Sequence, residues 1–328
     1  MKKVVVIFNG GTISMRVDER IHAAIPTLKG EEVMSMVTGI EEFAEIESYD
    51  FSNNPGPHMT PKIMLELSNY IKKFLERDDV SGVVVTHGTD SLEETAYLLD
   101  LTIDSDKPVI VTGAMRNSSE LGYDGPANLA ASICTAISDE SRKRGVLVCM
   151  NNEVHLASQV TKSHSMNLDA FRSPEFGSIG IVDDNKVLYY RRAFMKRQFI
   201  TSDKIEDKVA LIKAVAGDNS DVMKYLISIG YKGFVIEGMG RGNVPPAMLE
   251  GIKMAIDNNL PVVLVSRCFN GRVLDSYGYE GGGKTLRNMG VIFGDDLCGQ
   301  KARIKLMLAL GENKDLDRIK EIFEEGRY

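Results

Sequence analysis

The sequence predicts an α/β protein of two domains: a larger N-terminal domain built on a doubly wound, mainly parallel sheet, and a smaller C-terminal domain with a parallel sheet of its own. Three observations lead to this prediction. Short apolar, β-branched runs recur along the chain, segments with helical spacing lie between them, and a charged stretch without clear periodicity interrupts the alternation near residues 190–208. Continuous apolar runs are typical of strands buried on both faces, and strand–helix alternation is typical of parallel sheets.

The first domain is predicted over residues 1–190. Apolar runs predict its strands at residues 3–8, 82–86, 108–112 and 145–150. Helical spacing predicts its helices at residues 61–78, 91–101 and 128–138. In the first of these helices apolar residues recur every four positions, which places them on one side of a helix.

The second domain is predicted over residues 209–328, after a linker at residues 191–208. Its strands are predicted at residues 209–215, 233–237 and 261–266. Its helices are predicted at residues 245–258 and 301–310. Pro245 suits the start of a helix, because the N–H that proline lacks has no partner within the first turn.

Composition and charge limit the partners and the location of the protein. The chain has 328 residues and a formal net charge of -7. An acidic chain without a large basic cluster is not expected to bind nucleic acid or an anionic membrane surface. The apolar run at residues 4–8 is shorter than the core of a signal peptide, and no run is long enough to span a bilayer. We therefore expect a cytoplasmic protein.

The cysteines predict neither a disulfide framework nor a metal site. The four thiols are far apart in the sequence, at Cys134, Cys149, Cys268 and Cys298. Without a closely spaced pair, buried free thiols are the simplest interpretation. We expect no metal and no cofactor.

Three polar clusters follow predicted strands, where functional groups of parallel α/β proteins gather. The first comprises Asn9, Gly10, Gly11 and Thr12. The two glycines allow a sharp turn and a close approach of the backbone to a ligand, and a hydroxyl then projects from the turn. Taken alone, this motif is more typical of a plain turn or a phosphate-binding loop.

The second cluster is the run Thr86-His87-Gly88-Thr89-Asp90, which leads into a predicted helix with two acids in its first turn. Helix capping by Asp90 or by the serine after it accounts for part of this pattern. It does not account for the second hydroxyl. We interpret His87 as structural.

The third cluster surrounds Lys162, which has a hydroxyl residue on each side. A single lysine is usually a solvated surface charge. A partly buried lysine beside a hydroxyl and a carboxylate can instead accept a proton.

Two of these motifs together resemble the paired signature of the L-asparaginase/glutaminase family of the bacterial type. The members of this family are threonine amidohydrolases. The motifs are Asn9-Gly10-Gly11-Thr12-Ile13 and the run from Thr86 to Ala96. Further segments match in the same order, so the resemblance covers nearly the whole chain. They are residues 113–116, 124–129, 145–148, 160–162, 238–243 and 300–303.

The resemblance implies L-asparaginase activity, with hydrolysis of L-asparagine to L-aspartate and ammonia through a threonine acyl-enzyme. Thr12 matches the nucleophile of the family. Thr89, Asp90 and Lys162 match a polar triad across the pocket, in which Asp90 also binds the substrate α-ammonium. The sequence leaves open which threonine attacks first, and we favour Thr12.

The resemblance also implies a set of substrate-binding positions, which are Gly11, Gly56, Pro57, His58, Gly88 and Ala114. Family members with well-known asparagine specificity carry a polar pair where this chain has Gly56 and Pro57. The N–H of Gly56 and the ring of His58 are the groups left to hold the substrate carboxylate, because Pro57 has no N–H to donate. For His58 itself we favour a plain turn or cap residue before Thr60, and carboxylate binding is the alternative.

Family enzymes assemble as tetramers of intimate dimers, so the resemblance implies a homo-oligomer. Asn243 and Glu280 match positions that reach a neighbouring subunit's site. The segment of residues 14–28 lacks the tyrosine that family members pair with the nucleophile. Tyr277 and Tyr279 are candidate replacements, although a glycine-rich turn with surface aromatic residues explains them equally well. We expect residues 14–28 to form an irregular lid, and a disordered connection without a role is the alternative.

Other functions remain compatible with the sequence. The same chemistry would serve glutamine, a D-amino-acid amide or a non-standard amide. Amidotransferase relatives that supply ammonia to charged tRNA need an additional N-terminal domain, so that role is disfavoured. A non-catalytic amino-acid sensor is a third possibility, which the joint presence of Thr12, Thr89, Asp90 and Lys162 argues against.

Overall fold

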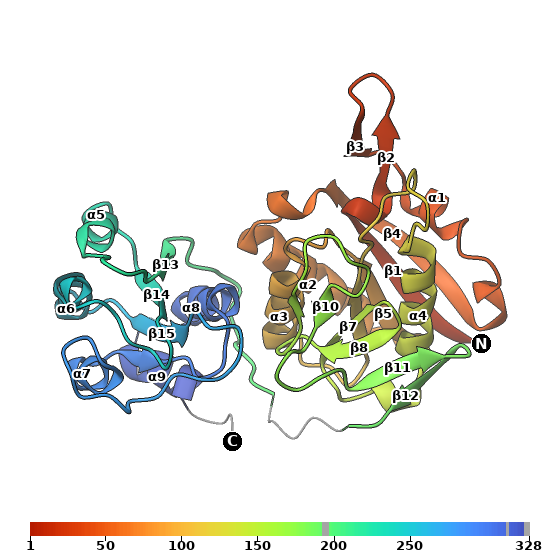
Figure 1. Ribbon diagram of the computed structural model, residues 1–328. Coiled ribbons are helices and arrows are strands. Elements are labelled where there is room, and N and C mark those ends of the chain that lie inside the picture. Colours follow the sequence, from red (N-terminus) through yellow and green to blue (C-terminus); the bar gives the residue numbers. More distant parts are fainter. Residues whose placement is uncertain (192–196, 313–314, 325–328) are drawn as a thin grey trace. The chain divides into compact units, whose positions relative to one another are not determined.

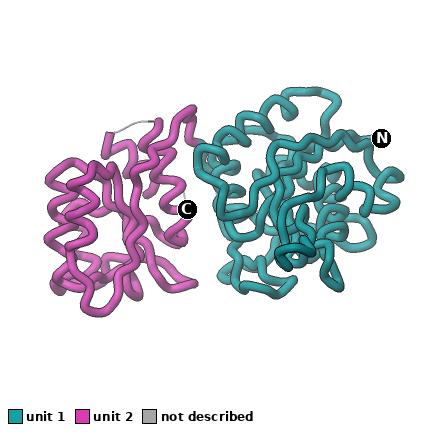
Figure 2. Tube along the Cα trace, turned by 90° about the horizontal axis from the view of Figure 1, so that it is seen from above, with its two compact units in different colours: residues 1–199 teal, residues 200–328 magenta. Residues whose placement is uncertain are grey.

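The computed structural model describes residues 1–191, 197–312 and 315–324. The chain divides into two compact units, residues 1–199 and residues 200–328 (Figure 2). The predicted linker at residues 191–208 includes residues 192–196, which lie outside the described part.

Unit 1 is built on an eight-stranded sheet with the strand order β12-β11-β8-β7-β6-β5-β1-β4. Its five parallel strands are β1 (Lys2–Gly10), β4 (Ala44–Asn54), β5 (Val80–Thr86), β6 (Val109–Thr112) and β7 (Val146–Met150). Three antiparallel strands extend one side, namely β8 (Glu153–Leu156), β11 (Gly180–Asp183) and β12 (Lys186–Tyr189). The sheet is therefore mainly parallel, as predicted.

Helices cover both faces of this sheet (Figure 1). One face packs against α2 (Pro61–Leu75) and α3 (Leu92–Thr102), and the other packs against α4 (Gly125–Ile137) and the short α1 (Gly30–Met34). Successive residues of β1 alternate between the two faces: Val4 and Val6 lie in the core with α4, whereas Val5 and Ile7 lie in the core with α2 and α3. This two-sided burial explains why the strand is continuously apolar.

Unit 2 contains a four-stranded parallel sheet in the order β13-β14-β15-β16. Its strands are β13 (Val209–Lys213), β14 (Gly233–Gly238), β15 (Val262–Ser266) and β16 (Ile292–Phe293). Its helices are α5 (Asp221–Ser228), α6 (Leu249–Asp257), α7 (Gly283–Met289), α8 (Gly299–Glu312) and α9 (Leu316–Glu324). Two separate parallel-sheet units confirm the predicted fold class.

The segment after Thr12 differs from the prediction. We expected residues 14–28 to be irregular, but they contain an antiparallel hairpin of β2 (Met15–Asp18) and β3 (Ala23–Pro26). The hairpin projects from the top of unit 1 in Figure 1. Its strands are only partly apolar, so hydrophobic patterning gave little sign of them.

A second small antiparallel pair forms later in unit 1. It joins β9 (Thr161–Lys162) to β10 (Phe171–Arg172). The pair is too short to leave a periodic signal in the sequence. It nevertheless fixes the backbone of Lys162.

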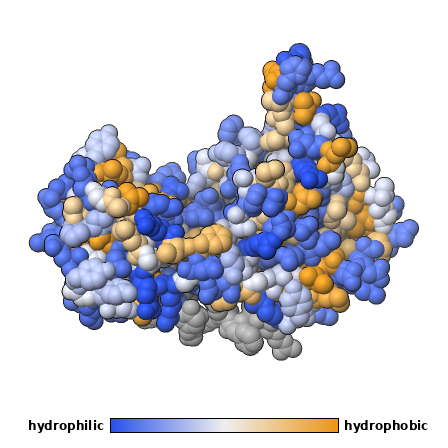
Figure 3. Space-filling model, in the orientation of Figure 1, coloured by the Kyte–Doolittle hydropathy of each residue, from blue (hydrophilic) through white to orange (hydrophobic). Residues whose placement is uncertain are grey.

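On the face drawn in Figure 3, hydrophilic residues predominate and hydrophobic patches are scattered among them. Within the described residues, no helix combines the length and the apolar character needed to cross a membrane. No disulfide joins the four cysteines, all of which the structure describes; Cys134 and Cys149 are buried, whereas Cys268 is exposed and Cys298 is half-buried. The expectation that the thiols are buried is therefore wrong for Cys268, which follows the end of β15.

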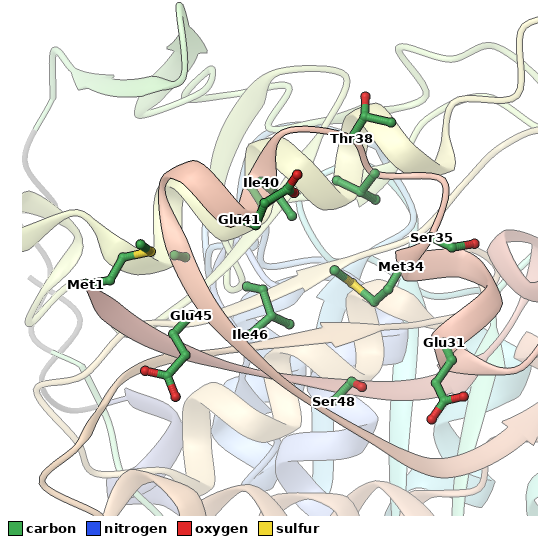
Figure 4. A pocket seen from close by; sticks show the side chains of 12 residues that line it. Met1, Glu31, Met34, Ser35, Thr38, Ile40, Glu41, Glu45, Ile46 and Ser48 are labelled. Atoms are coloured by element: carbon green, nitrogen blue, oxygen red, sulfur yellow. The ribbon is translucent and has the colours of Figure 1, made fainter.

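A pocket of about 820 Å³ opens beside the N-terminal ends of β1 and β4 (Figure 4). Methionine, aliphatic and carboxylate side chains line it, among them Met34, Ile46, Glu41 and Glu45. From the pocket to the polar clusters at their carboxyl ends, the two strands extend about 26 Å, at roughly 3.3 Å per residue. The pocket is thus remote from the candidate site.

Candidate active site

The turn that carries Thr12 begins where β1 ends. Gly10 and Gly11 have φ angles of 82° and 85°, which side chains other than glycine adopt only with strain. The Gly11 N–H donates to the Asn54 carbonyl at 2.9 Å, so this N–H is not available to a substrate. Thr12 opens the short 3-10 turn Thr12–Ser14 and is half-buried. Its hydroxyl forms no hydrogen bond to any part of the chain that the structure describes.

Three glycines bring the turns after β1, β4 and β5 into direct backbone contact. A Cβ atom at Gly11 would lie 2.3 Å from the Gly88 nitrogen, and a Cβ atom at Gly88 would lie 2.5 Å from the Gly56 nitrogen. A Cβ atom at Gly56 would lie 3.3 Å from the Asp90 Cβ. We call Gly11, Gly56 and Gly88 the glycine seam. All three were predicted substrate-binding positions, and the structure brings them together.

Thr89, Asp90 and Lys162 meet at the turn after β5. The Lys162 Nζ donates to Oγ1 of Thr89 at 2.9 Å and to Oδ1 of Asp90 at 2.7 Å. Thr89 is buried, and the Lys162 side chain is 17% exposed, but the Asp90 side chain is 62% exposed. The carboxylate of Asp90 can therefore hold the lysine and still face a ligand.

Glu93 fixes the backbone of Lys162, a role that the sequence did not suggest. Its Oε2 accepts the Lys162 N–H at 2.7 Å, and its side chain is buried in the first turn of α3. Acids in a first helical turn are usually explained by the helix dipole, so no sequence signal pointed to this contact. The β9–β10 pair supports Lys162 from the other side.

His87 lies directly beneath this turn and is fully buried. Its Nδ1 lies 2.8 Å from the Gly88 carbonyl oxygen, and its Nε2 lies 2.8 Å from the Thr95 hydroxyl. A carbonyl can only accept, so Nδ1 carries the hydrogen and Nε2 accepts from Thr95. Burial lowers the pKa of His87 to about 4. The ring is therefore neutral at pH 7 and braces the turn.

Ala114 is buried in the turn after β6, which packs against the same cluster. A Cβ atom at Gly113 would lie 3.3 Å from the Thr89 methyl group. The carboxylate of Asp124 accepts the Met115 N–H at 3.0 Å, and Asn128 Nδ2 donates to the Gly113 carbonyl at 3.0 Å. These two side chains, at the start of α4, hold the turn that contains Ala114.

Pro57 and His58 lie at the exposed end of the glycine seam. They belong to the 3-10 turn Gly56–His58, and both are exposed while Gly56 is buried. The His58 N–H donates to the Pro55 carbonyl at 2.9 Å. The exposed ring of His58, rather than its backbone N–H, is therefore the group that can reach a ligand.

The remaining predicted residues belong to unit 2. Asn243 is half-buried after β14, and its Nδ2 donates weakly to the Met239 carbonyl at 3.4 Å. Its Oδ1 is buried and has no hydrogen-bond partner within the described residues. The Val244 N–H donates to the Gly281 carbonyl at 2.9 Å. This bond brings the backbone next to Asn243 against the loop that carries Tyr277, Tyr279 and Glu280.

The aromatic loop of unit 2 is exposed. Tyr277 is 42% exposed and Tyr279 is 54% exposed, and their ring centroids lie 5.6 Å apart. Glu280 beside them is exposed as well. Both interpretations of the two tyrosines, as activators or as surface residues of a turn, remain predictions.

The side chains of this site in unit 1 are of types that can transfer protons and attack a carbonyl carbon. Thr12 follows β1, whereas Thr89 and Asp90 follow the neighbouring parallel strand β5 and are joined there by Lys162 of β9. Across the described ranges, no group of three or more histidine, cysteine, aspartate or glutamate residues is arranged to hold a metal ion.

Comparison with known proteins assigns both units. The family model for the N-terminal domain of asparaginase matches residues 3–195, and the model for the glutaminase/asparaginase C-terminal domain matches residues 208–323. The chain is 35% identical to an L-asparaginase of Bacillus licheniformis over 314 residues, which covers 96% of this chain and 97% of that protein. It is also 35% identical to a glutamyl-tRNA(Gln) amidotransferase subunit of Pyrococcus horikoshii, covering 97% of this chain and 74% of that protein.

A solved structure agrees with these matches. The probable cytoplasmic L-asparaginase of Campylobacter jejuni superposes with a TM-score of 0.89 at 33% identity, and the match covers all of both chains. The chain therefore belongs to the asparaginase family of amidohydrolases.

Proposed function

We propose that the chain is an L-asparaginase, which hydrolyses L-asparagine to L-aspartate and ammonia through an acyl-enzyme on Thr12. The observation that carries this proposal is the pair of hydrogen bonds by which Lys162 joins Thr89 to Asp90. The glycine seam packs their turn against the turn that bears Thr12. A hydroxyl nucleophile next to a group that moves protons is the arrangement that acyl transfer needs.

The proposed reaction has two steps. In the first step Oγ1 of Thr12 attacks the amide carbon, the C–N bond breaks, and the hydroxyl proton leaves with the nitrogen as ammonia. In the second step water attacks the ester, the aspartate carboxylate leaves, and Thr12 regains its proton. Thr89 and Lys162 supply the donors and acceptors for these transfers, and Asp90 holds Lys162 in place. Attack by Thr89 first is the alternative order.

Backbone N–H groups of Thr12, Thr89 and Ala114 stabilise the oxyanion in this proposal. Oxyanion donors need to be fixed before the reaction begins, because the charge develops only in the transition state. The support is the set of contacts that fix their turns: the glycine seam, the His87 brace and the Asp124–Asn128 pair.

Asp90 also binds the α-ammonium of the substrate in this proposal, and its exposed carboxylate supports that role. The substrate carboxylate is held by Gly56 and His58, with Pro57 and Ala114 in the wall of the pocket. The hairpin β2–β3 acts as the lid in place of the irregular loop that we expected.

We further infer a homotetramer of intimate dimers, in which Asn243 and Glu280 complete a neighbouring subunit's site. The buried Oδ1 of Asn243 supports this inference, because buried polar atoms in proteins are nearly always hydrogen-bonded. Tyr277 and Tyr279 are the proposed activators of the nucleophile. A cytoplasmic location agrees with the description of the Campylobacter jejuni protein, although a relative from Haemophilus influenzae, 33% identical, is described as a probable periplasmic L-asparaginase.

A second candidate function uses the same site on glutamine and passes the ammonia to a partner. The matches to glutamyl-tRNA(Gln) amidotransferase subunits favour it, including one from Archaeoglobus fulgidus at 34% identity that covers 98% of this chain and 78% of that protein. Hydrolysis of a D-amino-acid amide or a non-standard amide would use the same residues. A non-catalytic amino-acid sensor would keep the pocket without the reaction.

Ammonia release from a panel of amides tests the proposal. The panel contains L-asparagine, D-asparagine, L-glutamine and a simple acyl amide, each with wild type, Thr12→Ala and Thr89→Ala. Thr38→Ala is the matched control, because Thr38 is exposed and lines the remote pocket. We expect L-asparagine to give the highest kcat/KM, full activity in Thr38→Ala, and loss in both site variants.

Three results would contradict parts of the proposal. Activity that survives in both Thr12→Ala and Thr89→Ala excludes the threonine mechanism. A preference for glutamine favours the second candidate function. A folded wild type that binds amino acids but releases no ammonia favours the sensor.

A further inference from the structure

The loop between β6 and α4 is hydrogen-bonded to the segment that follows Thr12. The Tyr123 hydroxyl donates to the Ile13 carbonyl at 2.6 Å. Ser118 donates to the Met15 carbonyl through both its N–H, at 3.1 Å, and its hydroxyl, at 2.9 Å. The nucleophile's turn is thus held from outside its own strand.

Of these bonds, the one from Tyr123 lies nearest to Thr12, because its acceptor Ile13 is the next residue in the chain. Its ring is half-buried and folds back over the start of α4, where a Cβ atom at Gly125 would lie 2.4 Å from the tyrosine oxygen. A glycine at that position is therefore needed for the ring to reach Ile13. Burial, and to a smaller extent the charge of Asp124, raises the pKa of Tyr123, so the hydroxyl keeps its hydrogen and donates throughout the neutral range.

The same short segment also holds the opposite wall of the site. Asp124, the residue after Tyr123, accepts the N–H groups of Met115 and Arg116 at 3.0 and 2.9 Å. Asn128, one helical turn later, donates to the Gly113 carbonyl. Adjacent residues at the start of α4 therefore tie down the Thr12 turn and the Ala114 turn.

We propose that Tyr123 is a positioning residue, which fixes the Thr12 turn relative to the Ala114 turn and thereby orients the nucleophile toward the oxyanion donors. This inference rests on the proposed function of Thr12. Tyr123 acts through the Ile13 backbone and is given no contact with the substrate. Its removal should therefore lower kcat and leave KM nearly unchanged, because misplacement of a nucleophile costs rate more than ground-state binding.

Tyr123→Phe removes the donor and keeps the ring. Tyr189→Phe is the matched control, because Tyr189 is a half-buried tyrosine of unit 1 whose hydroxyl bonds Ser141 at 2.8 Å, on the β12 side of the sheet. Two readouts are compared: steady-state kinetics on the best amide, and hydrogen–deuterium exchange of peptides that cover residues 11–28. The second readout does not depend on activity.

We expect Tyr123→Phe to exchange about fivefold faster than wild type at the amides of Ser14, Thr27 and Leu28, which is the effect of one lost hydrogen bond. These amides donate to the carbonyls of Gly11 and Ser14. We expect kcat to fall about tenfold with KM within about twofold. Tyr189→Phe should match wild type in both readouts.

Unchanged exchange at residues 11–28, or an equal increase in Tyr189→Phe, would overturn the proposal. So would faster exchange with an unchanged kcat, because the turn would then be loosened without consequence for the nucleophile. A wild type that releases no ammonia contradicts the proposed function alone, and the exchange rates then decide by themselves whether Tyr123 fixes the turn.

Discussion

The Nζ atom of Lys162 lies 2.9 Å from the Oγ1 atom of Thr89, although the two residues are 73 positions apart in the chain. The bond joins the turn after β5 to the short β9–β10 pair, and Asp90 holds the same ammonium at 2.7 Å. The lysine is largely shielded from water, which supports its proposed part in proton transfer.

Lys162→Met tests the function of this bond. The variant keeps most of the side-chain volume and removes the ammonium, so we expect kcat to fall about 10²- to 10⁴-fold, the usual range for a positioned proton-transfer group. Lys186→Met, which changes an exposed lysine of β12, should retain full activity. Near-normal kcat in a folded Lys162→Met variant would exclude Lys162 from the reaction.

His87 should make the stability of unit 1 depend on pH. Its pKa is about 4 in the folded protein and near 6.5 when unfolded, so the unfolded state binds more protons between these values. The stabilisation is complete above about pH 6.5 and is lost as the pH falls toward 4. The loss is roughly 3 kcal/mol for a shift of this size.

Urea titrations at several pH values measure this effect. The free energy of unfolding of wild type should fall between pH 6.5 and 4 more steeply than that of His87→Gln, which has no ring to protonate. His164→Gln, which removes an exposed ring, is the control for the loss of a histidine. Equal slopes for wild type and His87→Gln would show that His87 is not held neutral by burial.

The glycine seam predicts a large cost for one added methyl group. In Gly88→Ala the new Cβ would lie 2.5 Å from the Gly56 nitrogen and 2.6 Å from its Cα, so two backbones must separate. We expect a loss of about 1–3 kcal/mol in the free energy of unfolding, together with a loss of activity.

Gly278→Ala is the matched control for stability. The Cβ atom of that variant would meet nothing within 4 Å, and its backbone angle suits other residues. It should change the free energy of unfolding by less than about 0.5 kcal/mol. If Gly88→Ala changes the free energy of unfolding equally little, the turns can separate freely and the glycine seam does not define the site.

Subunit complementation tests whether Asn243 acts on a neighbour. Thr12→Ala and Asn243→Ala should each be inactive when expressed alone. When the two variants are co-expressed and pair at random, about half of the dimers are mixed. Each mixed dimer has one intact site and one doubly altered site, so about a quarter of all sites are restored. Activity no higher than the sum of the separate variants would contradict a site shared between subunits.

The strands with continuous apolar runs could be predicted from the sequence, because burial on both faces leaves a direct signal. All four runs predicted in unit 1 became β1, β5, β6 and β7. β4 was missed because the strands were predicted from continuous apolar runs, whereas charged and apolar residues alternate in this edge strand. The β2–β3 hairpin was missed for a similar reason.

The functional side chains of the site could be predicted from the sequence. The residues that hold them in place were harder to predict. The carboxyl-end rule and the family resemblance led to Thr12, Thr89, Asp90 and Lys162, of which the structure brings the last three into direct contact. The contacts of Glu93 and Tyr123 were missed, because each is made to a backbone atom far away in sequence. Such contacts leave no local pattern.

Trapping the acyl-enzyme tests the central claim most directly. Wild type is mixed with L-asparagine, quenched in acid within the first turnover, digested and mapped by mass spectrometry. We expect an aspartyl ester on the peptide that contains Thr12, and none in Thr12→Ala. An ester on Thr89 instead, or ammonia release by wild type without any ester, would contradict Thr12 as the nucleophile.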